Sequence, residues 1–267
     1  MIYVQSFYCV LSNHLLIVNN VYFSYEEVEF MFTLEDINKE KERYISYSSN
    51  SIPDIQEVRY DLSGDNFGQV TFEEITSGNI ILHLNKSISK YNIKYQTSIL
   101  WHEFTHIYDL INCNYDIDMK KYYIKTISEI KAIQLELRYL LGLKKYEKVL
   151  YDTKTKIYFM NYHKTFEDIM DYYDSCCKIA FEKLVKDKTP NHFDTAFNNF
   201  MYLCGCVSVS YHELEYVNKL LDDYPNEYST QLKTFIELLY KKDERKICEA
   251  YSLFKDYVEM TSRLGIN

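Results

Sequence analysis

Glycine and proline are scarce in this chain, with six glycines and three prolines among 267 residues. Both residue types interrupt helices and mark turns, so the chain has little material for long irregular connections. The three prolines, Pro53, Pro190 and Pro225, also lie outside the segment 99–142, which carries the motif described below. The sequence therefore favours long helices, and its length is enough to bury one large core or two lobes in contact.

An excess of basic residues is also missing. The chain has 30 Lys and Arg against 39 Asp and Glu, which gives a net charge of −9. Nucleic-acid binding draws most of its affinity from clustered Lys and Arg on phosphates, so we expect no nucleic-acid partner. The 28 tyrosines could stack on bases, but Ile, Asn and Lys are abundant as well. We attribute this composition to an AT-rich gene rather than to a stacking surface.

Long apolar runs are absent too, since no run reaches the roughly 18 residues that a membrane span needs. The apolar stretch 7–18 has no basic residue before it and is interrupted by Ser12, Asn13 and His14, which is untypical of a signal peptide. The seven cysteines form no CxxC pair and leave an odd thiol, which argues against a disulfide framework. We expect no membrane partner and a cytoplasmic location.

The most informative motif is HExxH, in which His102, Glu103 and His106 occupy the fixed positions. Residues four apart lie on one face of an α-helix, so the two histidines can point a ring nitrogen at the same ion. A carboxylate beside that ion can take a proton from water, whose pKa zinc lowers to about 7. The spacing therefore predicts one Zn²⁺ ion held by His102 and His106, with Glu103 as general base.

Apolar residues recur at helical spacing around this motif, at Ile99, Leu100, Phe104, Ile107, Tyr108 and Ile111. Such a pattern is typical of a buried helix rather than a loop. We expect its metal-binding face to be turned into a cleft.

A third ligand is needed, because catalytic zinc typically takes three protein ligands and keeps the fourth position for water. Downstream of the motif, a helical pattern of apolar residues spans 118–141 and stops at Gly142, as a helix end should. Glu129 lies within this pattern, on the face that it shares with Ala132 and Glu136. The small Ala132 would let a neighbouring helix approach closely, so we predict Glu129 as the third ligand.

Asp109 is the rival ligand, three residues after His106 and on roughly the same face of the helix. We prefer a supporting role, in which Asp109 accepts a hydrogen bond from a ligand histidine and fixes its tautomer. The other reading of Asp109 is a solvated carboxylate near the helix end. His163, His192 and His212 have no spacing that points to the metal, although one of them could stabilise the oxyanion.

The two blocks 102–109 and 128–132 together resemble the gluzincin pattern. More specifically, an HExxHxYD block followed by an EIRA-like block is similar to the processing peptidases of the mitochondrial intermembrane space and to related bacterial and phage zinc peptidases. The resemblance implies that His102, His106 and Glu129 bind zinc and that Glu103 is the general base. It is confined to these two blocks.

The sequence also departs from the mitochondrial family. The cysteines that accompany the EIRA block in that family are absent near Glu129, and Lys131 stands in place of its arginine. Substrate and compartment therefore do not carry over from the resemblance.

We predict an α+β fold that is predominantly helical. A zincin-like catalytic lobe, residues 1–145, would combine a small sheet with the HExxH helix and the Glu129 helix, and a helical lobe would follow at 146–267. Helices are expected from Thr33 toward Arg43 and throughout the chain after Asp116, including 166–185, 193–217, 227–242 and 244–263. Strands are expected at 57–62, 69–74 and 79–84. The last takes the place of the zincin edge strand, beside which an extended peptide can add, although a plain core strand is compatible with the same pattern.

These features predict a zinc-dependent metallopeptidase that cuts a protein or peptide substrate by direct attack of activated water. One alternative is a catalytically inactive regulatory or protein-interaction module that binds zinc structurally. A further alternative is a helical interaction protein without a metal.

Overall fold

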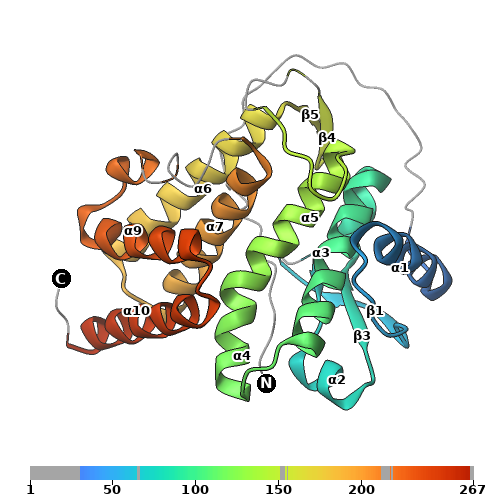
Figure 1. Ribbon diagram of the computed structural model, residues 1–267, viewed down its shortest axis with the longest axis horizontal. Coiled ribbons are helices and arrows are strands. Elements are labelled where there is room, and N and C mark those ends of the chain that lie inside the picture. The colour runs from blue at the N-terminus through green and yellow to red at the C-terminus, as the bar shows by residue number, and fades with distance from the viewer. Residues whose placement is uncertain are drawn as a thin grey trace.

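The computed structural model describes residues 31–64, 67–150, 154, 156–211, 217 and 219–264. The apolar stretch 7–18 and His212 lie outside these ranges. The described chain is mostly helical and has two small sheets, which confirms an α+β, predominantly helical fold (Figure 1). Within these ranges, no helix combines the length and the apolar character that crossing a membrane would require.

The helices, in chain order, are α1 (Leu34–Ser48), α2 (Phe72–Ser77), α3 (Ile93–Asn112), α4 (Ile117–Tyr123), α5 (Glu129–Leu141), α6 (Phe166–Lys186), α7 (Pro190–Val209), α9 (Asn226–Lys241) and α10 (Glu244–Leu264). The strands are β1 (Glu57–Leu62), β2 (Gly68–Gln69), β3 (Ile81–Asn85), β4 (Ile157–Phe159) and β5 (Tyr162–Lys164). Short 3₁₀ turns cover Lys86–Lys90 and Leu221–Asp223, and a π-helical turn covers Ile124–Ser128.

Helix α1 begins where the sequence predicts. The Thr33 side chain accepts a hydrogen bond from the Asp36 amide, and the Asp36 carboxylate accepts one from the Thr33 amide, which completes a capping box. The helix continues past Arg43 to Ser48 and ends at Ser49 in the left-handed conformation.

The larger sheet has the strand order β1-β3-β2, in which β3 pairs parallel with β1 and antiparallel with β2. The expectation that segment 79–84 forms an edge strand is therefore wrong, because β3 is bonded on both sides. The strand adjoining α3 at the edge of this sheet is the short β2.

The predicted strand at 69–74 is also wrong beyond Gln69. Thr71 caps α2 there, because its side chain accepts from the Glu74 amide while the Glu74 carboxylate accepts from the Thr71 amide. This T-x-x-E capping box starts a helix and outweighs the alternation that suggested a strand.

The sequence predicts helix throughout the chain after Asp116, and this prediction is wrong in two places. Strands β4 and β5 form an antiparallel hairpin, and α7 ends at Val209, before the predicted Val217. The backbone after α7 pairs with Val149, which donates to Val209 O and accepts from the Tyr211 amide. Helices α6, α9 and α10 match their predicted ranges to within one residue at each end.

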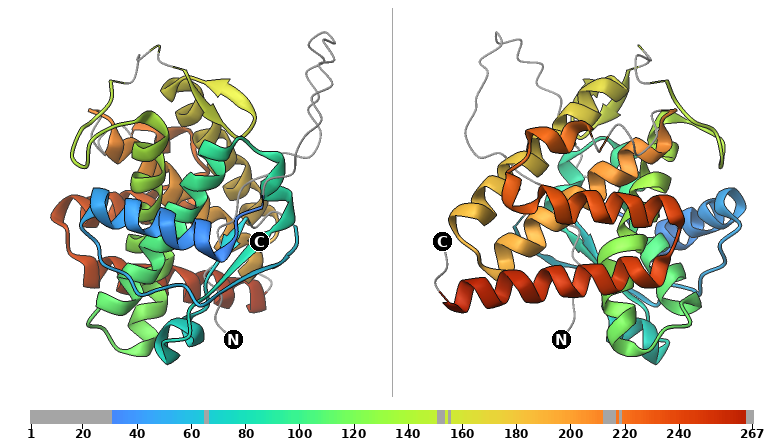
Figure 2. Two further views of the ribbon diagram at one scale, coloured as in Figure 1. Left: turned by 90° about the vertical axis from the view of Figure 1, so that its right-hand side faces the viewer. Right: turned by 60° about the vertical axis from the view of Figure 1, so that its left-hand side comes forward.

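Helices α3, α5, α7 and α6 pack in that order, each against the next (Figures 1 and 2). The larger sheet and α1 lie on the α3 side of this row, whereas α9 and α10 lie on the α7 side. Helix α7 approaches α5 at Gly205, where an added Cβ would come within 2.8 Å of the Ile133 Cβ. The buried core includes residues from both predicted lobes, from Phe32 to Val258, and the division near residue 145 stays a prediction.

Candidate metal centre

Helix α3 carries the HExxH motif through the interior of the protein. Asn92 caps its N-terminus by accepting a hydrogen bond from the Lys94 amide. Every residue from Tyr95 to Ile107 is buried, so the helix is covered on all sides rather than along one stripe. The predicted apolar pattern is met up to Ile107, but Tyr108 is half-buried and Ile111 is 42% exposed.

The structure brings three predicted ligands together. One ligand atom from each of His102, His106 and Glu129 lies within 4.8 Å of the other two. Glu129 Oε2 is 3.4 Å from His102 Nε2 and 3.7 Å from His106 Nε2, and all three side chains are fully buried. These are the residue types that catalytic zinc takes as ligands.

The ring nitrogens that face away from this cluster are held by hydrogen bonds. His102 Nδ1 is 3.1 Å from Glu136 Oε2, and His106 Nδ1 is 2.9 Å from Ser128 Oγ. With the Nδ1 atoms bonded in this way, both Nε2 atoms are aimed at Glu129. Such partners orient a metal-binding imidazole and fix its tautomer.

The sequence predicts that Asp109 accepts a hydrogen bond from a ligand histidine, but Glu136 and Ser128 are the residues that bond to the two Nδ1 atoms. Asp109 lies behind Ser128, which contacts the Asp109 side chain as well as His106, and its Oδ1 is 3.9 Å from Lys131 Nζ. Burial raises the pKa of Asp109 to about 6, although Lys131 and Ser128 lower it in part. The side chain of Asp109 is 5% exposed, which excludes the solvated carboxylate.

The pKa values of the two histidines are shifted in opposite directions. Burial opposes protonation of His102, but the carboxylates of Glu129 and Glu136 outweigh it and raise the pKa of His102 to about 10. Burial dominates at His106 and lowers its pKa to about 3, with Glu129 acting in the opposite direction. For Glu129 burial alone would raise the pKa, yet the positive charge of the His102 ring holds it below its usual value.

Glu103 is fully buried and lies on the side of α3 that faces the edge strand β2. Gly68 of β2 packs directly on it, because a methyl group at that glycine would come within 2.8 Å of Glu103 Cγ and Oε1. The backbone of the sheet edge thus borders the proposed general base.

A π-helical turn immediately precedes Glu129, where the sequence predicts a continuous helix over 118–141. Within this turn the Thr126 hydroxyl donates to Tyr122 O at 2.7 Å. A π turn holds one more residue than an α turn, so it rotates the residues after it around the helix axis. Ser128 is the last residue of the π turn and Glu129 the first residue of α5, and their side chains reach His106 and the ligand cluster.

Gly142, in the left-handed conformation, ends α5 as predicted.

The remaining predicted histidines lie elsewhere. His163 is exposed on β5 with its ring centroid 3.9 Å from that of Tyr158, and His192 Nδ1 bonds to Asp187 O. Neither belongs to the ligand cluster.

Glu136, Ser128 and Gly68 were not assigned roles from the sequence. Glu136 follows Glu129 by seven residues, which is two helical turns, so its place on the same face of α5 was visible. No local pattern pointed to Ser128 or Gly68.

Within the described part of the chain, both Nε2 atoms and both Glu129 oxygens are buried without a well-formed hydrogen bond, although His102 Nε2 and Glu129 Oε2 form an ion pair at 3.4 Å. Buried polar groups are rarely left in this state, and a shared cation would satisfy all of them. The donor set therefore fits a zinc ion.

The chain matches no family model, no curated protein and no solved structure.

Proposed function

We propose that this protein is a zinc-dependent metallopeptidase that hydrolyses peptide bonds in a protein or peptide substrate. The observation that carries the proposal is the convergence of His102, His106 and Glu129 within 4.8 Å, with Glu103 next to His102 on the same helix. A bound zinc ion would polarise the scissile carbonyl and lower the pKa of water to about 7.

The chain's own groups perform the remaining steps. His102 and His106 present their Nε2 atoms, and Glu136 and Ser128 hold the opposite sides of the rings. The Glu103 carboxylate takes a proton from the attacking water and delivers a proton to the leaving amine, which avoids a covalent intermediate.

The sheet supports a zincin-like, and more specifically gluzincin-like, architecture. Its edge strand β2 lies against Glu103 on α3, which is the arrangement that lets an extended peptide add to the sheet beside the catalytic base. The third ligand from a downstream helix agrees with the gluzincin pattern. We further propose that the protein acts in the cytoplasm and without a nucleic-acid partner.

The complete burial of the cluster favours a second candidate, a regulatory or interaction module that binds zinc without catalysis. His102, Glu103, His106 and Glu129 all have 0% exposure, and structural zinc sites are closed to solvent. Structural sites, however, are almost always completed by four protein ligands, and among the described residues only three converge. The number of ligands therefore favours catalysis.

The test compares wild type with Glu103→Gln for zinc content and for hydrolysis of an unfolded protein. We expect one zinc ion in each protein and hydrolysis in wild type only. Glu237→Gln, an exposed glutamate on α9, serves as the matched control and should leave both properties unchanged. Zinc with no hydrolysis in wild type would favour the regulatory module, and absence of zinc would favour the metal-free helical protein.

A further inference from the structure

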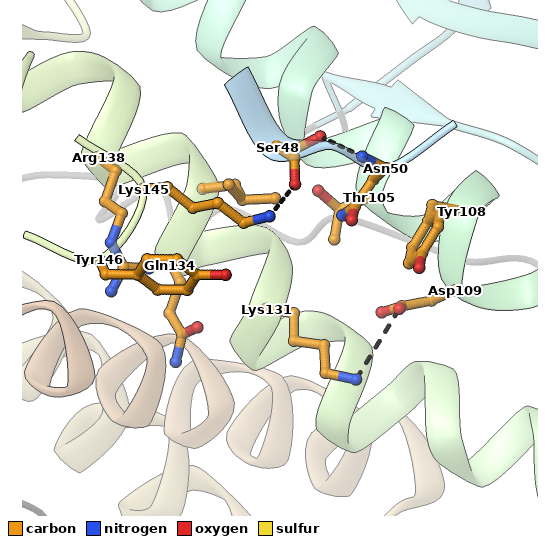
Figure 3. A pocket seen from close by; sticks show the side chains of 11 residues that line it. Ser48, Asn50, Thr105, Tyr108, Asp109, Lys131, Gln134, Arg138, Lys145 and Tyr146 are labelled. Carbon is orange, nitrogen blue, oxygen red and sulfur yellow. Dashed lines mark hydrogen bonds and ion pairs between the residues drawn. The ribbon is translucent and has the colours of Figure 1, made fainter. Parts of the chain in front are cut away.

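Behind the metal centre, on another face of α3 and α5, the protein has a cavity of about 350 Å³. It lies between these helices, the end of α1 and the segment 143–146 (Figure 3). None of the three candidate zinc ligands lines it. The cavity is therefore a separate site that does not depend on the proposed hydrolysis.

Three basic side chains line this cavity, but only one of them is paired with acidic groups. Lys131 Nζ lies 3.9 Å from Asp109 Oδ1 and 3.3 Å from Glu244 Oε1. Arg138 and Lys145 form no ion pair within the described part of the chain. In Figure 3 the Lys131–Asp109 pair occupies one end of the cavity, and Arg138 and Lys145 lie toward the other.

Arg138 is the more informative of these two cations. Its Nε atom is buried and has no hydrogen-bond partner among the described residues. Burial also lowers the pKa of this guanidinium below its ordinary value. A buried cationic N–H without an acceptor is costly, so an acceptor from a bound molecule would satisfy it.

Lys145 retains hydrogen-bonding capacity. Its ammonium donates to the carbonyl oxygen of Ser48, and an ammonium has three N–H donors, so two remain for a ligand. A second cavity, of about 620 Å³, shares Arg138 and adds Lys94 and Arg43 to its lining, and Arg43 is paired with Glu40 at 2.7 Å. This concentration of positive charge stands out in a chain whose net charge is −9.

We propose that the cavity binds the phosphate group of a small molecule through Arg138 and Lys145. A guanidinium matches two phosphate oxygens at once, and a lysine ammonium adds a point charge beside it. Asp109 does not oppose this anion strongly, because Lys131 neutralises it at the far end of the cavity. Tyr146, which is 81% exposed at the rim, offers an aromatic face to the rest of the ligand.

The experiment measures the thermal unfolding of the full chain with inorganic phosphate, with phenyl phosphate and with acetate, at constant ionic strength. At ten times its Kd, phosphate should raise Tm by about 2 to 3 °C, whereas acetate should raise it much less. Arg138→Gln and Lys145→Gln should each reduce the shift strongly and keep the wild-type zinc content. Lys233→Gln, whose ion pair with Asp222 lies on α9 and the turn before it, is the matched control and should keep the full shift.

Phenyl phosphate identifies the source of the phosphate group. Tighter binding of phenyl phosphate than of inorganic phosphate, lost in Tyr146→Ala, would assign the site to a phosphate ester with a ring. Equal binding would assign it to free phosphate. No shift in wild type, an equal shift with acetate, or a full shift in both Arg138→Gln and Lys145→Gln would overturn the proposal.

Discussion

Gly68 lies so close to Glu103 that a methyl group in place of its hydrogen would come within 2.8 Å of the Glu103 Cγ and Oε1 atoms. Glycine at this position is thus a condition for the observed position of the carboxylate. The backbone of β2 and the side chain of Glu103 form one unit, although 35 residues separate them in the sequence.

The first prediction concerns this contact. Gly68→Ala should displace the Glu103 carboxylate, and a shift of about 1 Å in a catalytic group can lower turnover by about 100-fold. Zinc content should remain that of wild type, because Glu103 is not a ligand in the proposed mechanism. Steady-state kinetics together with elemental analysis checks both points.

The control for this prediction is Gly64→Ala. Nothing lies within 4 Å of a methyl group at Gly64, but its φ of +73° disfavours alanine. This variant should lose some stability and keep the turnover of each folded molecule. Equal turnover in Gly68→Ala and wild type would show that Gly68 does not position the base.

A second prediction separates Glu129 from Asp109. Glu129→Ala removes a ligand and should abolish tight zinc binding, whereas Asp109→Asn acts only through Ser128 and should weaken it by at most about 10- to 100-fold. Competition with a chelator of known affinity measures both losses. Loss of zinc in Asp109→Asn together with tight zinc in Glu129→Ala would reverse the assignment and leave the HExxH interpretation intact.

A third prediction assigns Glu136 to the orientation of His102. Glu136→Gln keeps the side-chain volume but replaces the carboxylate 3.1 Å from His102 Nδ1, and it should weaken zinc binding by about 10- to 100-fold. The glutamine amide oxygen can still accept from Nδ1, so Glu136→Ala should have the larger effect. If both variants bind zinc as wild type does, Glu136 has no part in positioning the ring.

The local part of the candidate metal site could be predicted from the sequence, because helical spacing alone brings His102 and His106 to one face. Glu129 could be predicted as well, since the apolar pattern of its own helix identified the face on which it lies. Glu136 lay on that face too, but its bond to His102 Nδ1 depends on how α5 packs against α3, which no local pattern encodes.

The sheet edge was harder to predict for a similar reason. The strand β2 has only two residues, so it shows no alternation, and the Thr71 capping box that follows it ends the strand early. The sequence therefore predicts the more hydrophobic β3 as the edge strand, whereas hydrogen bonding on both sides makes β3 the central strand. The order in which strands pair is a tertiary property. A strand that is buried on both faces, as β3 is, shows in the sequence only as a nearly continuous run of hydrophobic residues.

The last prediction is that zinc binding releases about one proton per ion near pH 6, where water on the zinc, with a pKa of about 7, keeps its protons. The pKa of His102 is raised to about 10, so its ring is protonated at this pH, whereas His106, with a pKa of about 3, is neutral. Glu129, whose pKa is lowered, is ionised already. Zinc needs the lone pair on each Nε2, so only His102 must lose a proton. Zinc affinity should then rise about tenfold per pH unit between about pH 5 and 6.5. Calorimetric titrations in two buffers of different ionisation enthalpy give the proton count directly, and a count of zero would show that His102 is already neutral in the metal-free protein.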